Sequence, residues 1–209
     1  MASADSAGLP DIARTLSEAR AERKQEVAIT LFQVALRLCD AWYSAAGGTD
    51  ALILRAQTYA ELAYEQSTPA ARTASCRDAL DTLRPQASHT PEIADAYALL
   101  AVDCFQDLFN NLNFRSRLEI LRAARDRLDQ ASSGAMPPAI SSVLLSRKSS
   151  VLRHLALAEV APDSRLRRLK EAVRCAALAT QRERNKFTLL ELGLSGWALS
   201  EGTIDLYRF

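Results

Sequence analysis

The chain is poor in the residues that build sheets and turns. Its 209 residues include only 7 Val, 7 Ile, 7 Gly and 7 Pro. A sheet protein needs many β-branched residues and frequent turns rich in Gly or Pro, so these numbers argue against a large β-structure. Ala and Leu, both strong helix formers, occupy 68 positions, which favours an all-α protein. The chain is 48% hydrophobic and its net charge is only +1, so we expect it to fold rather than stay disordered.

The sequence shows no segment that would export the chain or cross a membrane. The N-terminal residues include Asp5 and no apolar core, which argues against a signal peptide. The longest apolar run, residues 96–102, is far shorter than the ~20 residues that a membrane-spanning helix needs. The cysteines are widely spaced, unlike those of secreted disulfide scaffolds, so we expect buried free thiols in a cytoplasmic protein. They are Cys39, Cys76, Cys104 and Cys175.

Motifs that carry catalysis or hold a metal are also missing. The seven glycines form neither of the two glycine-rich phosphate loops, G-x-x-x-x-G-K-[ST] and G-x-G-x-x-G. Gly193 and Gly196 flank a serine, but the G-x-S-x-G motif needs a glycine where Trp197 stands, so close helix packing explains these glycines better. Of the two histidines, we expect His89 to lie exposed in a turn and His154 to lie partly buried in a helix. The sequence therefore predicts a protein with no enzyme activity, catalytic residue, metal site or cofactor.

Capping residues and breaks predict nine helices. Their expected ranges are 10–22, 24–46, 50–67, 69–84, 91–111, 114–132, 138–160, 164–183 and 186–201. The first two could form one continuous helix, because neither Gly nor Pro separates them. Most connections are short, which favours antiparallel neighbours, and no linker rich in Pro, Gly or Ser divides the chain. We therefore expect a single domain over 9–201, after a flexible segment 1–8 and before a tail 202–209.

Alternate helices recur at a regular distance along the chain. From the third helix onward, every second helix begins 41–50 residues after the last. A small residue precedes an aromatic one by three positions in two first helices, at Ala56-x-x-Tyr59 and Ala94-x-x-Tyr97. Small residues also form one stripe in two of the second helices. These stripes are Ala124, Leu128 and Ala131, and Ala172, Ala176 and Ala179. The pattern predicts a stack of helical hairpins.

Over about 50–201 the chain resembles the tetratricopeptide-repeat family. The resemblance rests on Ile93-Ala94-x-x-Tyr97 in a first helix, on the Ala124, Leu128 and Ala131 stripe of a second helix, and on Pro137 after it. The spacing of 41–50 residues exceeds the 34 residues of that family, so the resemblance implies an α-solenoid with lengthened helices. A compact all-α bundle remains the alternative.

Charge is unevenly distributed along the chain. Residues 1–104 have a net charge of −5 and residues 105–209 a net charge of +6. The basic residues concentrate on the predicted helices 114–132 and 164–183, which should lie side by side as second helices of neighbouring hairpins. Their combined face could bind an acidic protein segment or a nucleic-acid backbone, or could simply be solvated. The candidate binding residues are Arg115, Arg122, Arg125, Arg165, Arg168 and Arg174.

The excess of arginine over lysine also fits either a binding face or a solvated face. Arginine outnumbers lysine by 22 to 4, which suits bidentate recognition of carboxylates and phosphates. The same excess is what a GC-rich bacterial genome would produce. In tetratricopeptide repeats, asparagines on first helices often hold the backbone of a bound peptide. The resemblance therefore adds Asn110 and Asn111 to the candidates, although they lie at a predicted helix end.

These features favour a non-enzymatic protein–protein interaction module, a scaffold or regulatory subunit that holds a protein segment in a helical groove. A nucleic-acid-binding regulator and a sensor of a peptide or metabolite are the alternatives.

The C-terminal residues raise a separate question. Gly202 is expected to end the last helix, and the residues TIDLYRF after it are largely apolar. We expect helix 187–201 to present an incompletely covered apolar face, because the last helix of a solenoid normally needs a polar cap. The exposed residues should include some of Leu189, Leu192, Trp197 and Leu199. The tail could fold back over this face, another chain could cover it by self-association, or the sequence could be part of a longer protein.

Overall fold

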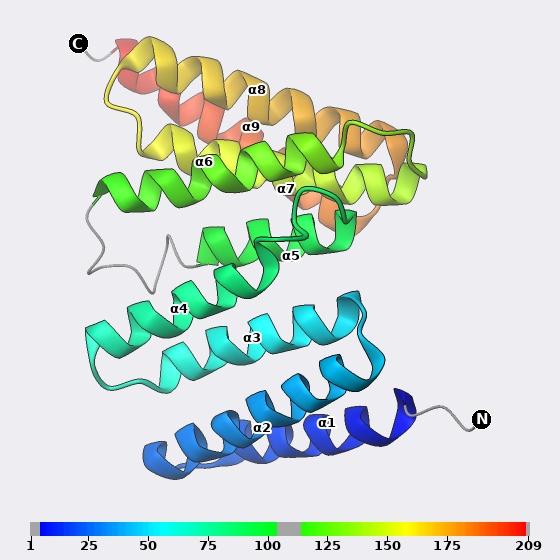
Figure 1. Ribbon diagram of the computed structural model, residues 1–209. Helices are drawn as coiled ribbons and strands as arrows, with labels where there is room; N and C mark the ends of the chain where they lie inside the picture. The colour runs from blue at the N-terminus through cyan, green and yellow to red at the C-terminus, as the bar shows by residue number, and fades with distance from the viewer. Residues whose placement is uncertain (1–4, 104–113, 208–209) are drawn as a thin grey trace. The chain divides into compact units, whose positions relative to one another are not determined.

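The computed structural model describes residues 5–103 and 114–207, and these residues contain nine α-helices and no strand (Figure 1). The helices are α1 (Asp5–Ala21), α2 (Gln25–Ala46), α3 (Thr49–Glu65), α4 (Pro69–Leu83), α5 (Pro91–Asp103), α6 (Phe114–Ala131), α7 (Pro138–Leu157), α8 (Pro162–Arg182) and α9 (Lys186–Tyr207). The all-α prediction is confirmed.

The predicted helix breaks have the expected local causes. Helix α4 begins at Pro69, and the Thr68 side chain accepts a hydrogen bond from the backbone N–H of Ala71 at 3.2 Å. Helices α2 and α3 are separated by Gly47 and Gly48, whose φ angles of 67° and 99° are strained for residues with a side chain. The two glycines predicted a helix break in the sequence, because glycine adopts such angles at little cost.

Some helix ends differ from the prediction. Helix α1 begins at Asp5, inside the segment 1–8 that was expected to be flexible, and α7 ends at Leu157 rather than at residue 160. The predicted separation of 10–22 from 24–46 is confirmed, and the alternative of one continuous helix is not.

Helix α1 ends at Ala21 and is not continuous with α2, because the Glu22 carboxylate accepts the backbone N–H of Lys24 at 2.8 Å and stabilises the turn. Helix α9 continues to Tyr207, so the end predicted at Gly202 is wrong. Gly202 is a packing glycine instead, since a Cβ there would lie 2.7 Å from Cδ1 of Leu169.

The described residues form two compact units, the first with α1–α4 and the second with α5–α9. In the first unit each helix packs closely against the next one along the chain. Side chains of α1, α2 and α3 share one hydrophobic cluster, and Arg20 of α1 also holds Glu61 of α3 with two hydrogen bonds of 2.6 and 2.7 Å. The cluster consists of Ile12, Leu16, Ala19, Phe32, Ala35, Leu36, Cys39 and Leu62. The single domain expected over 9–201 stays a prediction.

In the second unit α7 is the central helix. It packs against α5, α6, α8 and α9, while α5 also packs on α6 and α8 on α9 (Figure 1). The small-residue stripes of α6 and α8 are buried, as predicted, and so is Tyr97 of α5. Arg127 of α6 places its guanidinium carbon 4.6 Å from the centre of the Tyr97 ring. This contact ties α6 to α5 in addition to their apolar packing.

Replacing Tyr97 by Ala should lower the free energy of unfolding by about 3–5 kcal/mol, because a buried aromatic side chain leaves a cavity when it is removed. The Tyr97 side chain is only 2% exposed. Tyr64→Ala is the matched control: Tyr64 is 53% exposed, so its loss should cost under about 1 kcal/mol. Urea unfolding followed by circular dichroism measures both changes. Equal, small losses in the two variants would contradict the packing described for α5.

Candidate functional site

Helix α7 connects to its four neighbours through charged side chains. Each of three basic residues of α7 pairs with a carboxylate of a different helix. The pairs are Arg147–Asp95 to α5 at 2.6 Å, Lys148–Asp129 to α6 at 2.6 Å and Arg153–Glu191 to α9 at 3.2 Å. Lys148 also lies 3.7 Å from Glu171 of α8. These pairs position the helices of the second unit around α7.

Burial and the neighbouring carboxylates have opposite effects on the pKa of Lys148. Burial by itself would lower the pKa of Lys148, since the charged form loses water. Its hydrogen bond to Asp129 and the nearby charges of Asp129 and Glu171 outweigh burial and raise the pKa. Lys148 is therefore a cation held between α6 and α8, not a neutral amine available as a base.

A buried polar network joins α7, α8 and α9. The Ser149 hydroxyl donates to the backbone carbonyl of Ala172 at 2.8 Å, so its proton is used there. The hydroxyl of Ser195 lies 2.8 Å from that of Ser149 and 3.2 Å from a carboxylate oxygen of Glu191. Arg153 donates to both carboxylate oxygens of Glu191 at 3.2 Å. Because buried polar groups need partners, this network fixes which side of α9 faces inward.

The network does not present a nucleophile to solvent. The side chains of Ser149 and Ser195 are fully buried, and the hydroxyls bond to groups of neighbouring helices. His154 lies one turn from the network and is buried, as predicted, with its Nδ1 2.7 Å from the carbonyl of Ser150. Burial lowers the pKa of His154, and the charge of Arg153 lowers it further. These groups hold helices together.

The outward side of α9 is apolar, whereas its inward side is polar. Thr188, Glu191 and Ser195 are buried, but Leu190 is 62% and Trp197 66% exposed. Phe187 and Leu194 are exposed as well. We call these four exposed residues the apolar stripe of α9: Phe187, Leu190, Leu194 and Trp197. This arrangement reverses the usual amphipathic helix, in which the apolar side faces the core.

The incompletely covered face predicted for 187–201 is present, but its members differ. Leu189 and Trp197 are exposed as expected, whereas Leu192 and Leu199 are partly buried. The prediction missed Leu190 and Leu194. Their spacing of 3, 4 and 3 residues with Phe187 and Trp197 is the signal that would have identified them. Because α9 continues to Tyr207, residues 203–207 extend the helix and do not fold back over it.

Two glycines lie beside the apolar stripe without a packing role in the described structure. A Cβ built at Gly193 or Gly196 would have no other atom within 4 Å, apart from its own helix. The prediction that close helix packing explains these glycines is therefore wrong within the described residues. Each glycine costs a helix about 1 kcal/mol relative to Ala, and nothing within the described structure compensates for that cost.

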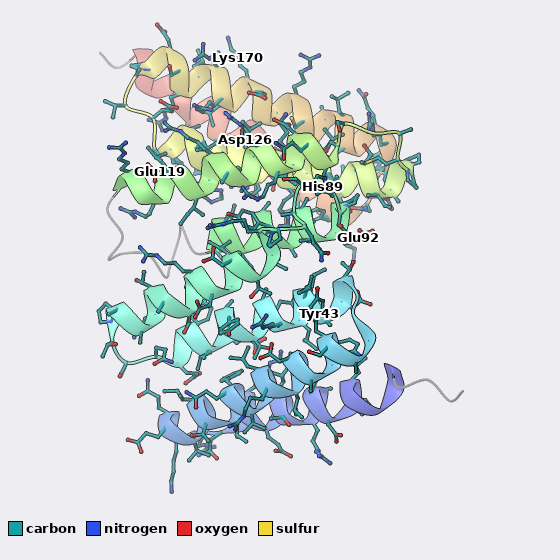
Figure 2. All side chains as sticks on the ribbon, in the orientation of Figure 1. Tyr43, His89, Glu92, Glu119, Asp126 and Lys170 are labelled. Atoms are coloured by element: carbon teal, nitrogen blue, oxygen red, sulfur yellow. The ribbon has the colours of Figure 1, made fainter. Side chains whose placement is uncertain are left out.

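A basic stripe runs along the outward side of α8. We define it as Arg167, Lys170 and Arg174, which follow each other at helical spacing and are all exposed (Lys170 is labelled in Figure 2). No ion pair links any of the three to a carboxylate among the described residues. Leu169 and Ala172 on the opposite side are buried. The helical spacing of these cations opposite buried residues is the signal that would have selected Arg167 and Lys170.

Helix α6 does not present the continuous basic face that the sequence suggested. Arg115 pairs with Glu119 at 3.2 Å, and Arg125 pairs with Asp126 at 2.6 Å. Glu119 and Asp126, labelled on α6 in Figure 2, thus interrupt its row of arginines. Arg122 is exposed and makes no ion pair with a described residue. The side of α6 is therefore mixed in charge.

The remaining candidates of α8 also differ among themselves. Arg168 is partly buried and donates to Glu159 at 2.6 Å, and Arg165 is partly buried. Of the three candidates on α8, only Arg174 is exposed. Helices α6 and α8 are not among the closely packed pairs of this unit, since each packs on α7. Asn110 and Asn111 lie outside the described residues.

The thiols and the other candidate ligands fit the expectations in part. Cys39, Cys76 and Cys175 are buried and form no disulfide, as predicted, and Cys104 lies outside the described residues. Burial raises the pKa of Cys39 and of Cys175, which disfavours their reactive thiolates. Over 5–103 and 114–207, no group of three or more His, Cys, Asp or Glu side chains is placed to hold a metal ion. In the same residues, no helix combines the length and apolarity that crossing a membrane requires.

An open depression of about 470 Å³ lies near the start of α5, and exposed His89 is part of its lining. The other lining residues are Ser88, Asp129, Gln130 and Ser133. Ligand sites typically combine an apolar lining with a few convergent polar groups. This depression is open to solvent and would not enclose a ligand, so it does not favour the alternative of a ligand sensor.

Comparison with known proteins gives no match: neither a protein-family model nor a curated protein nor a solved structure matches the chain.

Stability should fall as the pH is lowered from about 6.5, because the buried His154 accepts a proton less readily than in the unfolded chain. Below that pH the unfolded state binds more protons, so acid favours unfolding until the lower folded-state pKa is reached. One such group contributes at most about 1.4 kcal/mol per pH unit. The His154→Gln variant should show a weaker pH dependence of its melting temperature. His89→Gln, at an exposed position, is the control; identical profiles for wild type and His154→Gln would refute the effect.

Proposed function

We propose that the chain is a non-enzymatic helical interaction protein that binds other protein chains through its second unit, as a scaffold or regulatory subunit of the cytoplasm. One observation carries this proposal: α9 faces outward with Leu190 and Trp197 and inward with Glu191 and Ser195. Contiguous exposed apolar residues of this kind mark interaction surfaces in soluble proteins.

The energetic argument is direct. Complete burial of a Leu or Phe side chain stabilises by about 1.5–3 kcal/mol relative to exposure. Leu190 and Trp197, which are 62% and 66% exposed, leave most of this contribution unused. The buried network prevents α9 from turning its stripe inward. A partner chain that covers the stripe would gain that free energy without any rearrangement of the second unit.

We also propose that the helices form a tetratricopeptide-like stack of lengthened hairpins. In the second unit, consecutive helices pack together, and α7 additionally packs on the alternate helices α5 and α9. First helices that contact both their own partner and the next first helix are what a stack of hairpins requires. The resemblance of the Ala94-x-x-Tyr97 segment supports the same arrangement, since both residues are buried.

The basic stripe of α8 favours an acidic partner. Arg167, Lys170 and Arg174 are exposed and have no carboxylate partner among the described residues, unlike Arg115 and Arg125 of α6. A segment rich in Asp or Glu would supply the missing charges, and arginine binds carboxylates with two parallel hydrogen bonds. Because α8 packs along α9, one partner could contact both stripes.

Replacing Leu190 and Trp197 together by Ser should abolish capture of protein partners while leaving the helical circular-dichroism signal intact. Both side chains are mostly exposed, so the fold loses little when they become polar. The tagged chain is used as bait in extract of the source organism, to which an untagged copy of the chain has been added so that self-association is also detected. Mass spectrometry then identifies the captured proteins.

The matched control changes Leu157 and Val160 to Ser, two exposed apolar residues outside the stripe. Proteins retained by wild type and control but lost from the Leu190→Ser/Trp197→Ser variant would support the proposal. The same retained proteins in all three samples would refute it.

Reversing the basic stripe, with Arg167→Glu, Lys170→Glu and Arg174→Glu, should weaken binding of a labelled oligo-glutamate peptide by at least about tenfold. Fluorescence anisotropy at about 50 and about 200 mM salt measures this, with duplex DNA as a second probe.

A variant with Arg23, Lys24 and Arg77 changed to Glu in the first unit has the same net charge and should bind like wild type. Equal binding of the peptide by both triple variants would contradict a role of the stripe. Binding of the DNA but not of the peptide would favour the nucleic-acid alternative.

A further inference from the structure

We infer that the apolar stripe of α9 is covered by a second copy of this chain, with two α9 helices packed antiparallel about a twofold axis. The inference rests on the proposed function only in taking the stripe as a contact surface, and it adds the identity of the partner. Symmetric dimers are the commonest soluble oligomers, and a twofold interface requires a surface that is complementary to itself.

The stripe has the spacing of a helix–helix seam. Phe187, Leu190, Leu194 and Trp197 follow at intervals of 3, 4 and 3 residues, which is the alternation that places side chains between two packed helices. All four are at least partly accessible to a second helix, although the Arg147 guanidinium of α7 already lies 5.5 Å from the centre of the Phe187 ring. The seam continues over about three turns of α9.

Charge complementarity decides between the possible orientations. Lys186 is exposed at the start of the seam and Glu201 at its end. They lie 15 positions apart, about 22 Å along the helix, and equally far from the point between Gly193 and Leu194. With the twofold axis at this point, each Lys186 faces Glu201 of the second copy. A parallel arrangement would instead place the two lysines together and the two glutamates together.

The same register pairs two of the four stripe residues with each other, while Phe187 faces Ser200 of the second copy. It sets Leu190 opposite Trp197 of the second copy, and Leu194 opposite Gly193. The open space above Gly193 then has a purpose, because a residue without a side chain lets two helix backbones approach closely. The helix dipoles also oppose each other in this orientation, so the partial charges at the helix ends are complementary.

The buried polar network fixes the orientation of the apolar stripe. Ser195 and Glu191 are held by Ser149 and Arg153 of α7, so α9 cannot rotate about its axis without leaving these groups unpaired. The stripe is therefore presented to a second copy in a fixed orientation, and dimer formation needs no rearrangement of the second unit.

Exchange of the two charges tests the register. Lys186→Glu and Glu201→Lys, made separately, should each weaken dimerisation by about tenfold, because each replaces two attractive contacts with two repulsive ones. The double variant Lys186→Glu/Glu201→Lys should dimerise like wild type, since each introduced glutamate again faces a lysine of the second copy. Light scattering coupled to size exclusion over a range of concentrations measures the mass against the 22.9 kDa of one chain.

The control is Lys24→Glu, an exposed lysine of the first unit that should not change the dimer. A wild type that stays monomeric at every concentration would overturn the inference. So would single variants that dimerise as well as wild type, because the charges would then not face each other in the dimer. If the chain is monomeric and Leu190→Ser/Trp197→Ser still loses captured proteins, the inference fails while the proposed function stands with another occupant of the stripe.

Discussion

The second unit is organised by the burial of α7, whose basic residues must all find carboxylates in the surrounding helices. A largely covered cation without a partner is destabilising, so Asp95, Asp129 and Glu191 restrict how α5, α6 and α9 pack on α7. Buried serines on the same helix, such as Ser142 and Ser149, let the neighbouring helices approach closely. The core of this unit is therefore specified by polar contacts as much as by apolar packing.

The orientation of α9 follows from that constraint. Its polar residues satisfy Arg153 and Ser149, and the helix consequently turns its leucines and its tryptophan toward solvent. The polar contacts of α9 with α7 thus leave the apolar side of α9 facing solvent. The apolar stripe is therefore a consequence of how the unit folds, and a change at Glu191 would alter both the stability of the unit and the presentation of the stripe.

The charges on the two basic helices show why sequence alone did not separate the arginines that have an ion-pair partner from those that have none. Arg115 and Arg125 of α6 each have an acid within reach on their own helix, so local ion pairs neutralise them. Arg168 pairs instead with Glu159, in the connection before α8. Only the pattern of burial separates these residues from Arg167, Lys170 and Arg174, which point away from the core and have no ion-pair partner among the described residues.

The sequence by itself determined the helical class and most helix boundaries, because caps such as Thr68-Pro69 and breaks such as Gly47-Gly48 act on the local backbone. It also determined that Tyr97 and the alanine stripes are core, since their spacing places them on one side of a helix. It predicted separate helices α1 and α2 but left a continuous helix open, because a glutamate side chain there replaces the usual Gly or Pro. Only the tertiary structure decided which side of α9 faces inward, because that choice depends on Ser149 and Arg153, which lie about forty positions away and meet α9 only after folding.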